Sequence, residues 1–473
     1  MGKKAVFGKF FHTPSFTEDA SFLENTLICI DENGIIERII KKEENDNFDE
    51  IKAEYAALNQ LINFNTEHHW ILPGMIDTHI HAGQFDNIGR ALHLPLEKWL
   101  FEYTFPLESS FSDINLARER YNTLVENLLA QGTTTAVYFA TIHEEATVEL
   151  AKICLEKKQR AFVGKVCMDN PDQCPDYYIE KTSECVTSME NVINKIHKMA
   201  DEHKNMDQKS FPCHITWNES RRVRPIITPR FIPSCTNELL QKLSELADKY
   251  PDVLIQSHSS ESNWVMEYCS NRFDGKTDTE VYNEFGLLRK NSLWAHSIFL
   301  SPSDVALFIE KKASISHCPL SNFYFGNACF PARHFYDCGL TQIGLGTDIS
   351  GGYSNSMLDS CRNAVIASLA LENGVDPTNK NRKYAHPAKL SITQSFYLAT
   401  VGGAAALGID HFVGTFEVGK SFDAMLIVSP FSIQSCSNSN HQELFERILY
   451  HTNESRIKVV WVQGDIVSIK PVR

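Results

Sequence analysis

Two histidines, His79 and His81, lie two positions apart in the apolar segment MIDTHIH (75–81). If this segment is a strand, side chains two positions apart point to the same side, and both imidazoles can reach one metal ion. With 18 histidines among 473 residues, random placement gives about one such pair. The pair alone therefore leaves open whether the two histidines bind a metal or pack in the core.

Other polar residues end further apolar segments of the chain. From residue 75 onward, eight short runs rich in Val, Ile, Thr or aromatic residues alternate with longer segments that carry helix signals. Continuous runs of this kind are typical of strands buried on both faces of a parallel sheet. Six of the eight runs carry, at or near their ends, a residue suited to metal binding or proton transfer: His79 and His81, Arg230, His258, His296, His317 and Asp348.

Eight strand–helix units over about 300 residues predict an α/β fold of the (β/α)₈ TIM-barrel type, with an open doubly wound sheet as the alternative. In such a barrel, the residues that do chemistry lie at the C-terminal ends of the strands. Three imidazoles and one carboxylate describe a zinc site that leaves a position free for water. Zinc lowers the pKa of such a water towards neutrality, although nitrogen and oxygen ligands also admit iron.

Three residues near the predicted strand ends also have structural explanations. Glu261 follows His258 by three residues; a loop could fold it over the site as a proton shuttle, or it could begin a helix and favour the helix dipole. Arg230 ends an apolar strand, so its charge must face either a polar cavity or an ion-pair partner. For His317, which precedes Cys-Pro, we expect a supporting role at the barrel mouth.

The two ends of the chain differ from its middle. Residues 1–72 contain short strand-like segments around the turn dipeptide Asn33-Gly34, and residues 412–473 are similarly rich in strands and short turns. We expect both ends to pair as one small β-sandwich domain beside a barrel that spans 73–411.

Helix signals separate the predicted barrel strands. Thr236 precedes a segment whose leucines share one helical face, Ser301 precedes a proline, and Ser391 with Gln394 forms a capping-box pattern. The segment 201–220 is polar and aperiodic, so we expect it to be an insertion or a mobile loop.

The composition is that of an ordinary globular protein in a reducing compartment. The net charge of −14 disfavours binding to nucleic acid. The 13 cysteines are an odd number, show no CxxC spacing and lie mostly in apolar stretches. Because the sequence shows neither a signal-peptide pattern nor a membrane-spanning apolar run, we expect a cytoplasmic protein with no membrane partner.

The segment PGMIDTHIHAGQF (73–85) resembles the opening metal motif of the amidohydrolase superfamily. More specific segments resemble the guanine-deaminating branch of that superfamily, and the resemblance covers nearly the whole chain. Three family motifs are altered here. HASQ has Gly83 in place of its serine, AHG has Ser297 in place of its glycine, and HCPNSN has Leu320 in place of its first asparagine. The matching segments are KWLFEYTFP (98–106), GTTTAVYFATIH (132–143), QRAFVGKVCMD (159–169), TPRF (228–231), QSHSSE (256–261), SHCPLSN (316–322), GLGTDISGGYSNSMLD (344–359) and VGTFEVGKSFDAMLI (413–427).

The resemblance implies a set of site residues, matched motif by motif. The implied metal ligands are His79, His81, His258 and Asp348, holding one zinc ion per subunit. The implied catalytic residues are Glu261, Asp348 and His296. The implied substrate contacts are His81, Gln84, Arg230, Phe231, His258, Glu261 and Asp348. The resemblance also implies guanine as the substrate and a homodimer.

The implied reaction is hydrolytic deamination of guanine to xanthine and ammonia. Asp348 or His296 would take a proton from the attacking water, and Glu261 would protonate the ring nitrogen beside carbon 2. Arg230 would donate a hydrogen bond to the purine's carbonyl oxygen. Two alternatives stay open: a related amidohydrolase that deaminates another aminated heterocycle, and a non-catalytic scaffold or cytoskeletal binder on the same fold.

Overall fold

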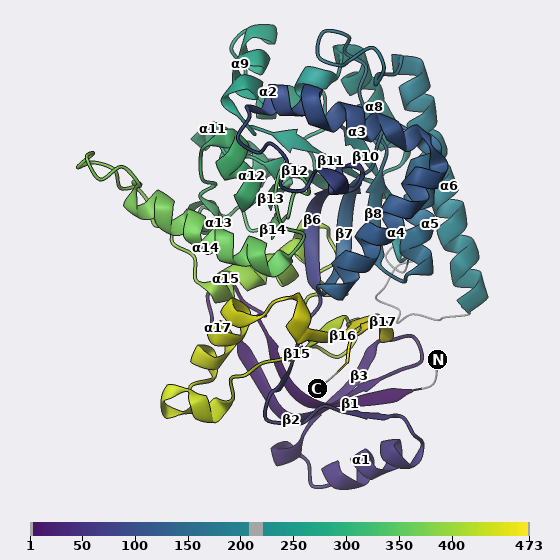
Figure 1. Cartoon of the computed structure of the whole chain (residues 1–473), viewed down its shortest axis with the longest axis vertical. Coiled ribbons are helices and arrows are strands. Elements are labelled where there is room, and N and C mark those ends of the chain that lie inside the picture. Colours follow the sequence, from purple (N-terminus) through teal and green to yellow (C-terminus); the bar gives the residue numbers. More distant parts are fainter. Residues whose placement is uncertain (1–2, 208–220, 472–473) are drawn as a thin grey trace.

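The computed structural model describes residues 3–207 and 221–471 of the chain. The described residues form two sheets, one of nine strands from the middle of the chain and one of eight strands from its two ends. Figure 1 shows the helices of the middle region packed around the first sheet, with the second sheet beside it.

Eight parallel strands of the first sheet follow one another in the order of the sequence, which confirms the predicted barrel. Seven of the eight apolar segments contain one of these strands, and the eighth ends one residue before its strand does. The strands are β6 (Met75–His81), β7 (Thr133–Phe139), β8 (Arg160–Gly164), β10 (Val223–Pro229), β11 (Leu254–Ser259), β12 (Ser292–His296), β13 (Ser314–His317) and β14 (Ile343–Leu345). The two-residue strand β9 (Val166–Cys167) follows β8 and pairs with β10.

Hydrogen bonds join the first strand, β6, to the last strand, β14, and to the loop that follows it, which brings the two ends of the sheet together. His79 accepts a bond from the backbone N–H of Asp348 at 2.9 Å, and His81 donates to the carbonyl oxygen of Ile349 at 2.8 Å. The Thr78 hydroxyl adds a bond of 2.8 Å to the carbonyl oxygen of Leu345. Closure therefore places the His79–His81 pair directly beside Asp348.

The longer helices surround the barrel, and the three that carry a start signal in the sequence begin at that signal. Thr236 caps α8, and reciprocal capping boxes start α11 at Ser301 and α15 at Ser391, the latter with Gln394. The longer barrel helices are α4 (Ile114–Ala130), α5 (Glu144–Glu156), α6 (Thr182–Asp207), α8 (Asn237–Lys249), α9 (Asn263–Arg272), α10 (Asp278–Glu284), α11 (Pro302–Lys311), α13 (Ala332–Asp337), α14 (Met357–Asn373) and α15 (Ile392–Tyr397). Shorter ones are α2 (Leu96–Trp99), α3 (Phe105–Ser109), α12 (Pro319–Ser321) and α16 (Gly403–Ala406).

The prediction of a loop over 201–220 is wrong for residues 201–207, which form the last turns of α6. The earlier part of α6 buries an apolar face that includes Val192 and Ile196. Once such a helix exists, each further residue adds a hydrogen bond at little additional cost, so polar residues can extend it. Residues 208–220 lie outside the described residues.

The two chain ends form one mixed sheet, as expected from their strand-rich sequences. Strand β15 from the C-terminal part pairs with β5 from the N-terminal part, in the order β17-β16-β15-β5-β1-β2-β3 with β4 beside β1. Its strands are β1 (Lys4–His12), β2 (Ser21–Ile30), β3 (Ile36–Lys41), β4 (Leu61–Asn63), β5 (His69–Pro73), β15 (Ala424–Val428), β16 (Ile457–Val462) and β17 (Asp465–Ile469). Helices α1 (Phe48–Ala57) and α17 (His441–His451) belong to the same end segments.

The turns at the two ends of this sheet lie against each other. The turn between β2 and β3, at the predicted Asn33-Gly34 position, touches the turn between β16 and β17. There the Gln463 side chain donates a hydrogen bond of 3.0 Å to the carbonyl oxygen of Asn33. The fold encloses an apolar core that includes Phe10 and Trp461. The domain limits 1–72, 73–411 and 412–473 stay predictions.

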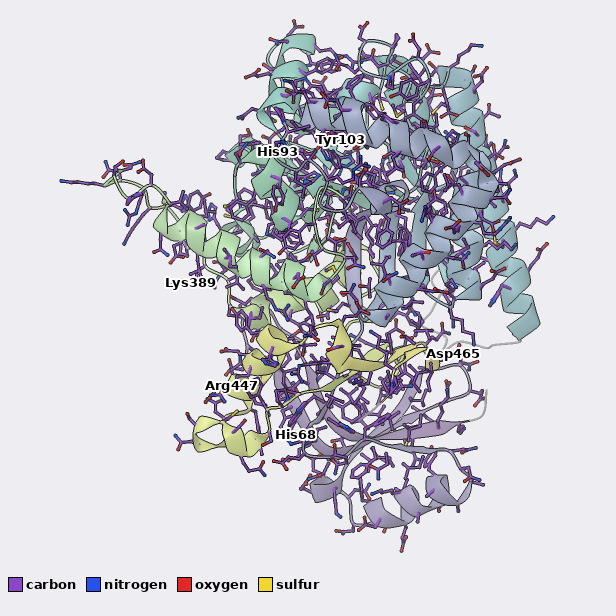
Figure 2. All side chains as sticks on the ribbon, viewed as in Figure 1. His68, His93, Tyr103, Lys389, Arg447 and Asp465 are labelled. Atoms are coloured by element: carbon purple, nitrogen blue, oxygen red, sulfur yellow. The ribbon has the colours of Figure 1, made fainter. Side chains whose placement is uncertain are left out.

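Charged residues at the start of the barrel strands contact the β domain. Arg160, the first residue of β8, forms a buried ion pair with Asp423. Asp465, labelled in Figure 2 where the two parts meet, lies 3.5 Å from both Lys158 and Arg222. These contacts use the N-terminal ends of the barrel strands, which leaves the C-terminal ends to form a site.

The twelve cysteines in the described part of the chain are unpaired, and ten of them are buried. This agrees with their predicted behaviour as small apolar residues. No helix among the described residues is both long and apolar enough to cross a membrane.

Candidate active site

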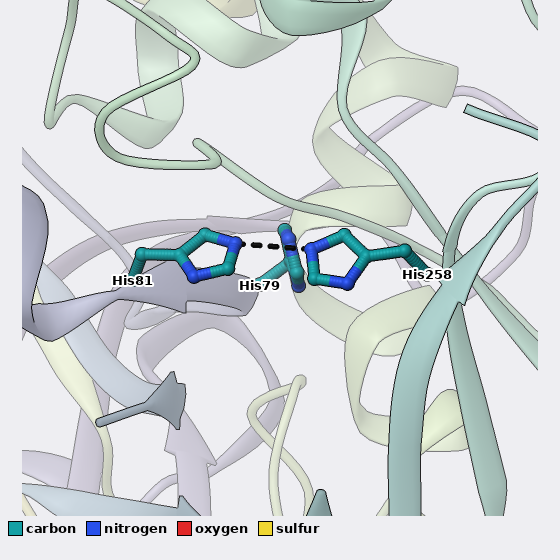
Figure 3. A group of neighbouring side chains, drawn as sticks. All are labelled: His79, His81 and His258. Atoms are coloured by element: carbon teal, nitrogen blue, oxygen red, sulfur yellow. Dashed lines mark hydrogen bonds between the residues drawn. The ribbon is translucent and has the colours of Figure 1, made fainter. Parts of the chain in front are cut away.

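Three histidines from two strands of the barrel lie close together. His79 and His81 come from β6 and His258 from β11, and Figure 3 shows their rings gathered around one point. The Nε2 atoms of His81 and His258 are 3.0 Å apart. Asp348, just after β14, places its Oδ1 atom 3.2 Å from Nε2 of His79 and 3.6 Å from Nε2 of His81. The four residues predicted as metal ligands are therefore neighbours.

This cluster has the donor atoms that a metal ion requires. Two overlapping groups of three residues could each hold an ion, because one ligand atom from each residue lies within 4.8 Å of the other two. The groups are His79, His81 and His258, and His79, His296 and Asp348. Among the described residues, the buried Nε2 atom of His296 has no hydrogen-bond partner, and that of His79 has the Asp348 carboxylate as a neighbour at 3.2 Å. Buried polar atoms are almost always satisfied, so these nitrogens are available for a ligand. Imidazole and carboxylate donors fit a zinc-type ion.

Neighbouring groups set the tautomers of two of the histidines. Nδ1 of His258 donates to the carbonyl oxygen of Arg230 at 2.6 Å, which leaves a lone pair on Nε2 facing the cluster. Nδ1 of His296 lies 3.0 Å from Oδ1 of Asn322, so its Nε2 is likewise unprotonated. Burial lowers the pKa of His296 to about 4, and the neutral form predominates near pH 7.

Asp77 connects the strand that carries the histidine pair to the loop that carries Asp348. Its Oδ1 atom accepts bonds from the backbone N–H of Thr347 at 3.0 Å and of His79 at 3.1 Å. Burial raises the pKa of Asp77 to about 7, against the opposing effect of these hydrogen bonds. The sequence analysis missed this residue, although it lies inside the MIDTHIH segment.

The backbone turns sharply where the site residues leave their strands. Ser260, His296, Ser297 and Asp348 all adopt left-handed φ angles, of 49°, 70°, 51° and 50°. Such angles are costly for residues other than glycine and concentrate at functional sites. At Ser297 the family that this sequence resembles has glycine, which adopts this conformation without strain.

A small cavity opens beside the cluster. All seven residues predicted to contact a substrate line it. Apolar side chains from α2 and from later loops complete its wall, so a flat, partly apolar molecule would match the lining. The lining residues are His81, Gln84, Leu96, Trp99, Leu100, Arg230, Phe231, His258, Glu261, Phe325, Asp348 and Gly351.

Glu261 lies in this cavity and outside any helix. It comes two residues after β11 and one residue before Ser262, which caps α9. The sequence left open whether Glu261 lies over the site or begins a helix, and its position favours the first alternative. Its Oε1 atom is 3.5 Å from Nε2 of His296. Burial, followed by the negative charge of Asp348, raises the pKa of Glu261 well above its ordinary value.

The sequence left open whether the charge of Arg230 faces a polar cavity or an ion-pair partner. Arg230 does both, because it lines the cavity and also forms an ion pair. Its two terminal nitrogens lie 2.6 and 3.0 Å from the carboxylate oxygens of Glu108. Burial opposes the charge, but Glu108 outweighs it and the pKa of Arg230 is raised. Gln84 donates to the same carboxylate at 2.7 Å. The sequence analysis missed Glu108, which ends no strand and belongs to no metal-like spacing.

His317 lies behind the cluster and outside both metal-capable groups. Its Nδ1 atom is 3.5 Å from the Asn322 amide nitrogen, and its ring packs against Phe330. This is the supporting place that the sequence analysis expected. Leu320 is buried in α12, and Gly83 leaves room for Thr141, whose methyl group would lie 2.8 Å from a Cβ atom added at that glycine.

Comparison with known proteins agrees with this geometry. Residues 70–467 match the amidohydrolase family. The guanine deaminase of Homo sapiens is 37% identical over 471 residues, which cover 97% of this chain and 95% of the relative. That of Dictyostelium discoideum is 35% identical over 458 residues, covering 94% and 93%.

Solved structures show the same similarity. A crystal structure of guanine deaminase from C. acetobutylicum with bound guanine in the active site superimposes with a TM-score of 0.81 and 30% identity, covering 98% of this chain and all of the other. The guanine deaminase of E. coli gives a TM-score of 0.82 at 27% identity, covering 99% of this chain and 100% of the other. The chain therefore belongs to the amidohydrolase family, in the branch that contains the guanine deaminases.

Proposed function

We propose that this chain catalyses the hydrolytic deamination of guanine to xanthine and ammonia, with one zinc ion per subunit. The observation that carries the proposal is the cavity that joins a three-histidine, one-carboxylate cluster to Glu261 and Arg230. The full-length similarity to guanine deaminases supports guanine as the substrate.

His79, His81, His258 and Asp348 would hold the zinc ion. When bound, zinc supplies a water molecule whose pKa lies near neutrality and which is therefore a ready nucleophile. Asp348 or His296 would accept the proton of the attacking water, since Nε2 of His296 lies 3.9 Å from Oδ2 of Asp348 and carries no proton of its own. The water oxygen would then attack carbon 2 of the purine.

Glu261 would act as the proton donor and relay. Its raised pKa favours the protonated form, which can protonate the ring nitrogen next to carbon 2. The second proton of the water would pass through Glu261 to the amino group, which leaves as ammonia while the carbonyl of xanthine forms. The first proton would then return from Asp348 or His296 to Glu261, which restores its protonated form. One water molecule is consumed and one ammonia is released, so the reaction is balanced without a redox cofactor.

Arg230 and Phe231 would recognise the base. A guanidinium N–H donated to the carbonyl oxygen at carbon 6 is a charge-assisted hydrogen bond. Adenine has an amino group at that position, which would face Arg230 donor to donor and leave a buried polar group unpaired. Phe231 is buried beside the cavity and offers its ring to the flat apolar surface of the purine.

The test combines an assay of guanine conversion to xanthine with metal analysis of the purified protein. We expect turnover in samples that contain one zinc ion per chain. A zinc-loaded sample without turnover would overturn the proposal. A panel of guanine, adenine, cytosine and melamine-like rings decides between guanine and another aminated heterocycle, and a scaffold without catalytic activity would turn over none of them.

A homodimer and a cytoplasmic location also stay predictions. Sedimentation of the purified chain measures the first, and fractionation of cells measures the second.

A further inference from the structure

Glu108 is a buried carboxylate just outside the cavity that the proposed function assigns to the base. It lies in α3 and is not itself one of the lining residues. Its side chain is fully shielded from solvent, yet every bond that it makes is to a charged or polar partner. A carboxylate in this position is costly unless its oxygens are fully satisfied.

Four donors satisfy the two oxygens of Glu108. Oε1 accepts from Nε2 of Gln84 at 2.7 Å and from Nη2 of Arg230 at 3.0 Å. Oε2 accepts from Nη1 of Arg230 at 2.6 Å and from the hydroxyl of Tyr178 at 2.8 Å. Three loop regions of the barrel, carrying Gln84, Tyr178 and Arg230, therefore converge on this one carboxylate.

The carboxylate determines which way the Gln84 amide faces. An ionised carboxylate only accepts hydrogen bonds, so the amide must turn its NH₂ group towards Glu108. Its oxygen then faces Ser350, whose backbone N–H lies at 3.3 Å and whose hydroxyl lies at 3.4 Å. One N–H of Gln84 is used by Glu108, and the other remains for the cavity that Gln84 lines.

The same carboxylate holds Arg230 and balances its charge. Its two parallel bonds fix the plane of the guanidinium, and the Phe105 ring lies 5.0 Å from the central carbon. A planar group held in this way keeps its remaining N–H donors in one place. The ion pair also reduces the positive charge that a neutral base would meet beside the histidine cluster.

We propose that Glu108 is a positioning residue that turns the NH₂ group of Gln84 and holds the donor-only guanidinium of Arg230 so that both offer N–H donors to the base, and thereby selects purines with an oxygen at carbon 6. This inference rests on the proposed function and extends it from the lining residues to the group behind them. A neutral amide at position 108 could both donate and accept, so Gln84 could face either way and Arg230 would lose its counter-charge.

The test measures inhibition constants for two ligands that differ at carbon 6. Hypoxanthine carries an oxygen there, whereas unsubstituted purine does not, and neither has the reacting amine. In Glu108→Gln we expect weaker hypoxanthine binding by about tenfold or more, with purine binding changed less than about twofold. The kcat/KM for guanine should fall, with zinc content unchanged. An unaltered preference for hypoxanthine over purine in this variant would overturn the inference.

Two further variants separate positioning from general damage. Tyr178→Phe removes one donor but leaves the ion pair and the Gln84 bond, so the hypoxanthine-to-purine ratio should stay within about threefold of wild type. Glu108→Asp keeps an acceptor-only carboxylate but shortens the side chain by one methylene group, so it cannot keep all four bonds, and we expect part of the preference to be lost. If Glu108→Gln does not fold, a wild-type preference in a zinc-loaded Glu108→Asp would overturn the inference, and a reduced preference with unchanged zinc content would support it.

The wild-type protein separates this inference from the proposed function. Absence of guanine turnover in the zinc-loaded wild type contradicts the proposed function. Turnover in the wild type, together with equal losses of hypoxanthine and purine binding in Glu108→Gln, contradicts only the role of Glu108.

Discussion

His81 and His258 face each other with their Nε2 atoms 3.0 Å apart, although 177 positions separate them in the sequence. Because Nδ1 of His258 donates to a backbone carbonyl oxygen, its Nε2 presents a lone pair to His81. Without a metal, the Nε2–H group of His81 can donate to this lone pair, whereas a metal ion would take both nitrogens as ligands. The two rings are close enough to share one ion, so we expect metal binding to stabilise the site.

Removal of the metal should lower both turnover and thermal stability. A ligand that binds only the folded chain stabilises it by about 4 kcal/mol when present at a thousand times its dissociation constant. We expect a chelator to abolish guanine turnover and to lower the melting temperature, and zinc to restore both. The measurements are turnover, metal content and calorimetry before and after dialysis.

The matched variants for this prediction are His81→Ala and His93→Ala. His93 is exposed on the surface and is labelled in Figure 2, so its replacement should leave the effect of the chelator unchanged. The His81→Ala variant should bind little metal, so the chelator should hardly change its melting temperature. A chelator effect of equal size in His81→Ala and wild type would contradict the ligand assignment.

Replacement of Glu261 by glutamine should separate metal binding from catalysis. The amide has nearly the same shape but cannot deliver a proton, so turnover should fall by about 10²–10⁴. Zinc content should match wild type because Glu261 belongs to neither metal-capable group. Steady-state kinetics and metal analysis of the same preparation measure both quantities, and near-normal turnover would rule out the assigned role.

Replacement of Ser297 by glycine should stabilise the protein. Ser297 is fully buried with φ 51°, and its hydroxyl has no hydrogen-bond partner among the described residues. Glycine removes the left-handed strain and the unsatisfied hydroxyl, at some cost in unfolded-state entropy, for a net gain of about 1 kcal/mol.

Chemical denaturation of Ser297→Gly and Ser297→Ala checks this expectation. Alanine removes the hydroxyl but keeps the Cβ atom in the left-handed conformation. Glycine should therefore be the more stable of the two variants, and the reverse order would show that strain at this position is negligible.

His12 should make the protein less stable as the pH falls. Burial lowers the pKa of His12 to about 4, with a smaller upward effect of Glu417 and a downward one of Lys420. The unfolded chain binds a proton at about pH 6.5, so between about pH 6.5 and pH 4 it binds more protons than the folded chain. The contribution of His12 to the free energy of unfolding is therefore complete above pH 6.5 and is smaller by about 2 kcal/mol at pH 5.

The variant His12→Asn tests this pH dependence without leaving a donor unpaired. The asparagine oxygen can replace Nδ1 of His12, which accepts from the backbone N–H of Phe416 at 3.3 Å. Denaturant unfolding at pH 7 and pH 5 should show a smaller loss of stability in the variant than in wild type. Equal losses in both would contradict a buried neutral histidine.

Much of the fold could be predicted because local sequence encodes it. The segment 75–81 coincides with β6 residue for residue, and the caps at Thr236, Ser301 and Ser391 lie where their side chains predict helix starts. Strand burial and helix capping depend on residues a few positions apart, so a single sequence contains their signals. The histidines and Asp348 could be found because strand ends in a barrel share one face.

Only the tertiary structure decided which distant residues become partners. The ion pair between Glu108 and Arg230 spans 122 positions, and neither residue carries a local signal of the other. The extension of α6 over 201–207 likewise depends on a helix already stabilised by packing. The sequence by itself determined the chemical groups and the strand ends that carry them. Folding decided which carboxylate faces which donor, because that depends on loop paths that no short-range pattern encodes.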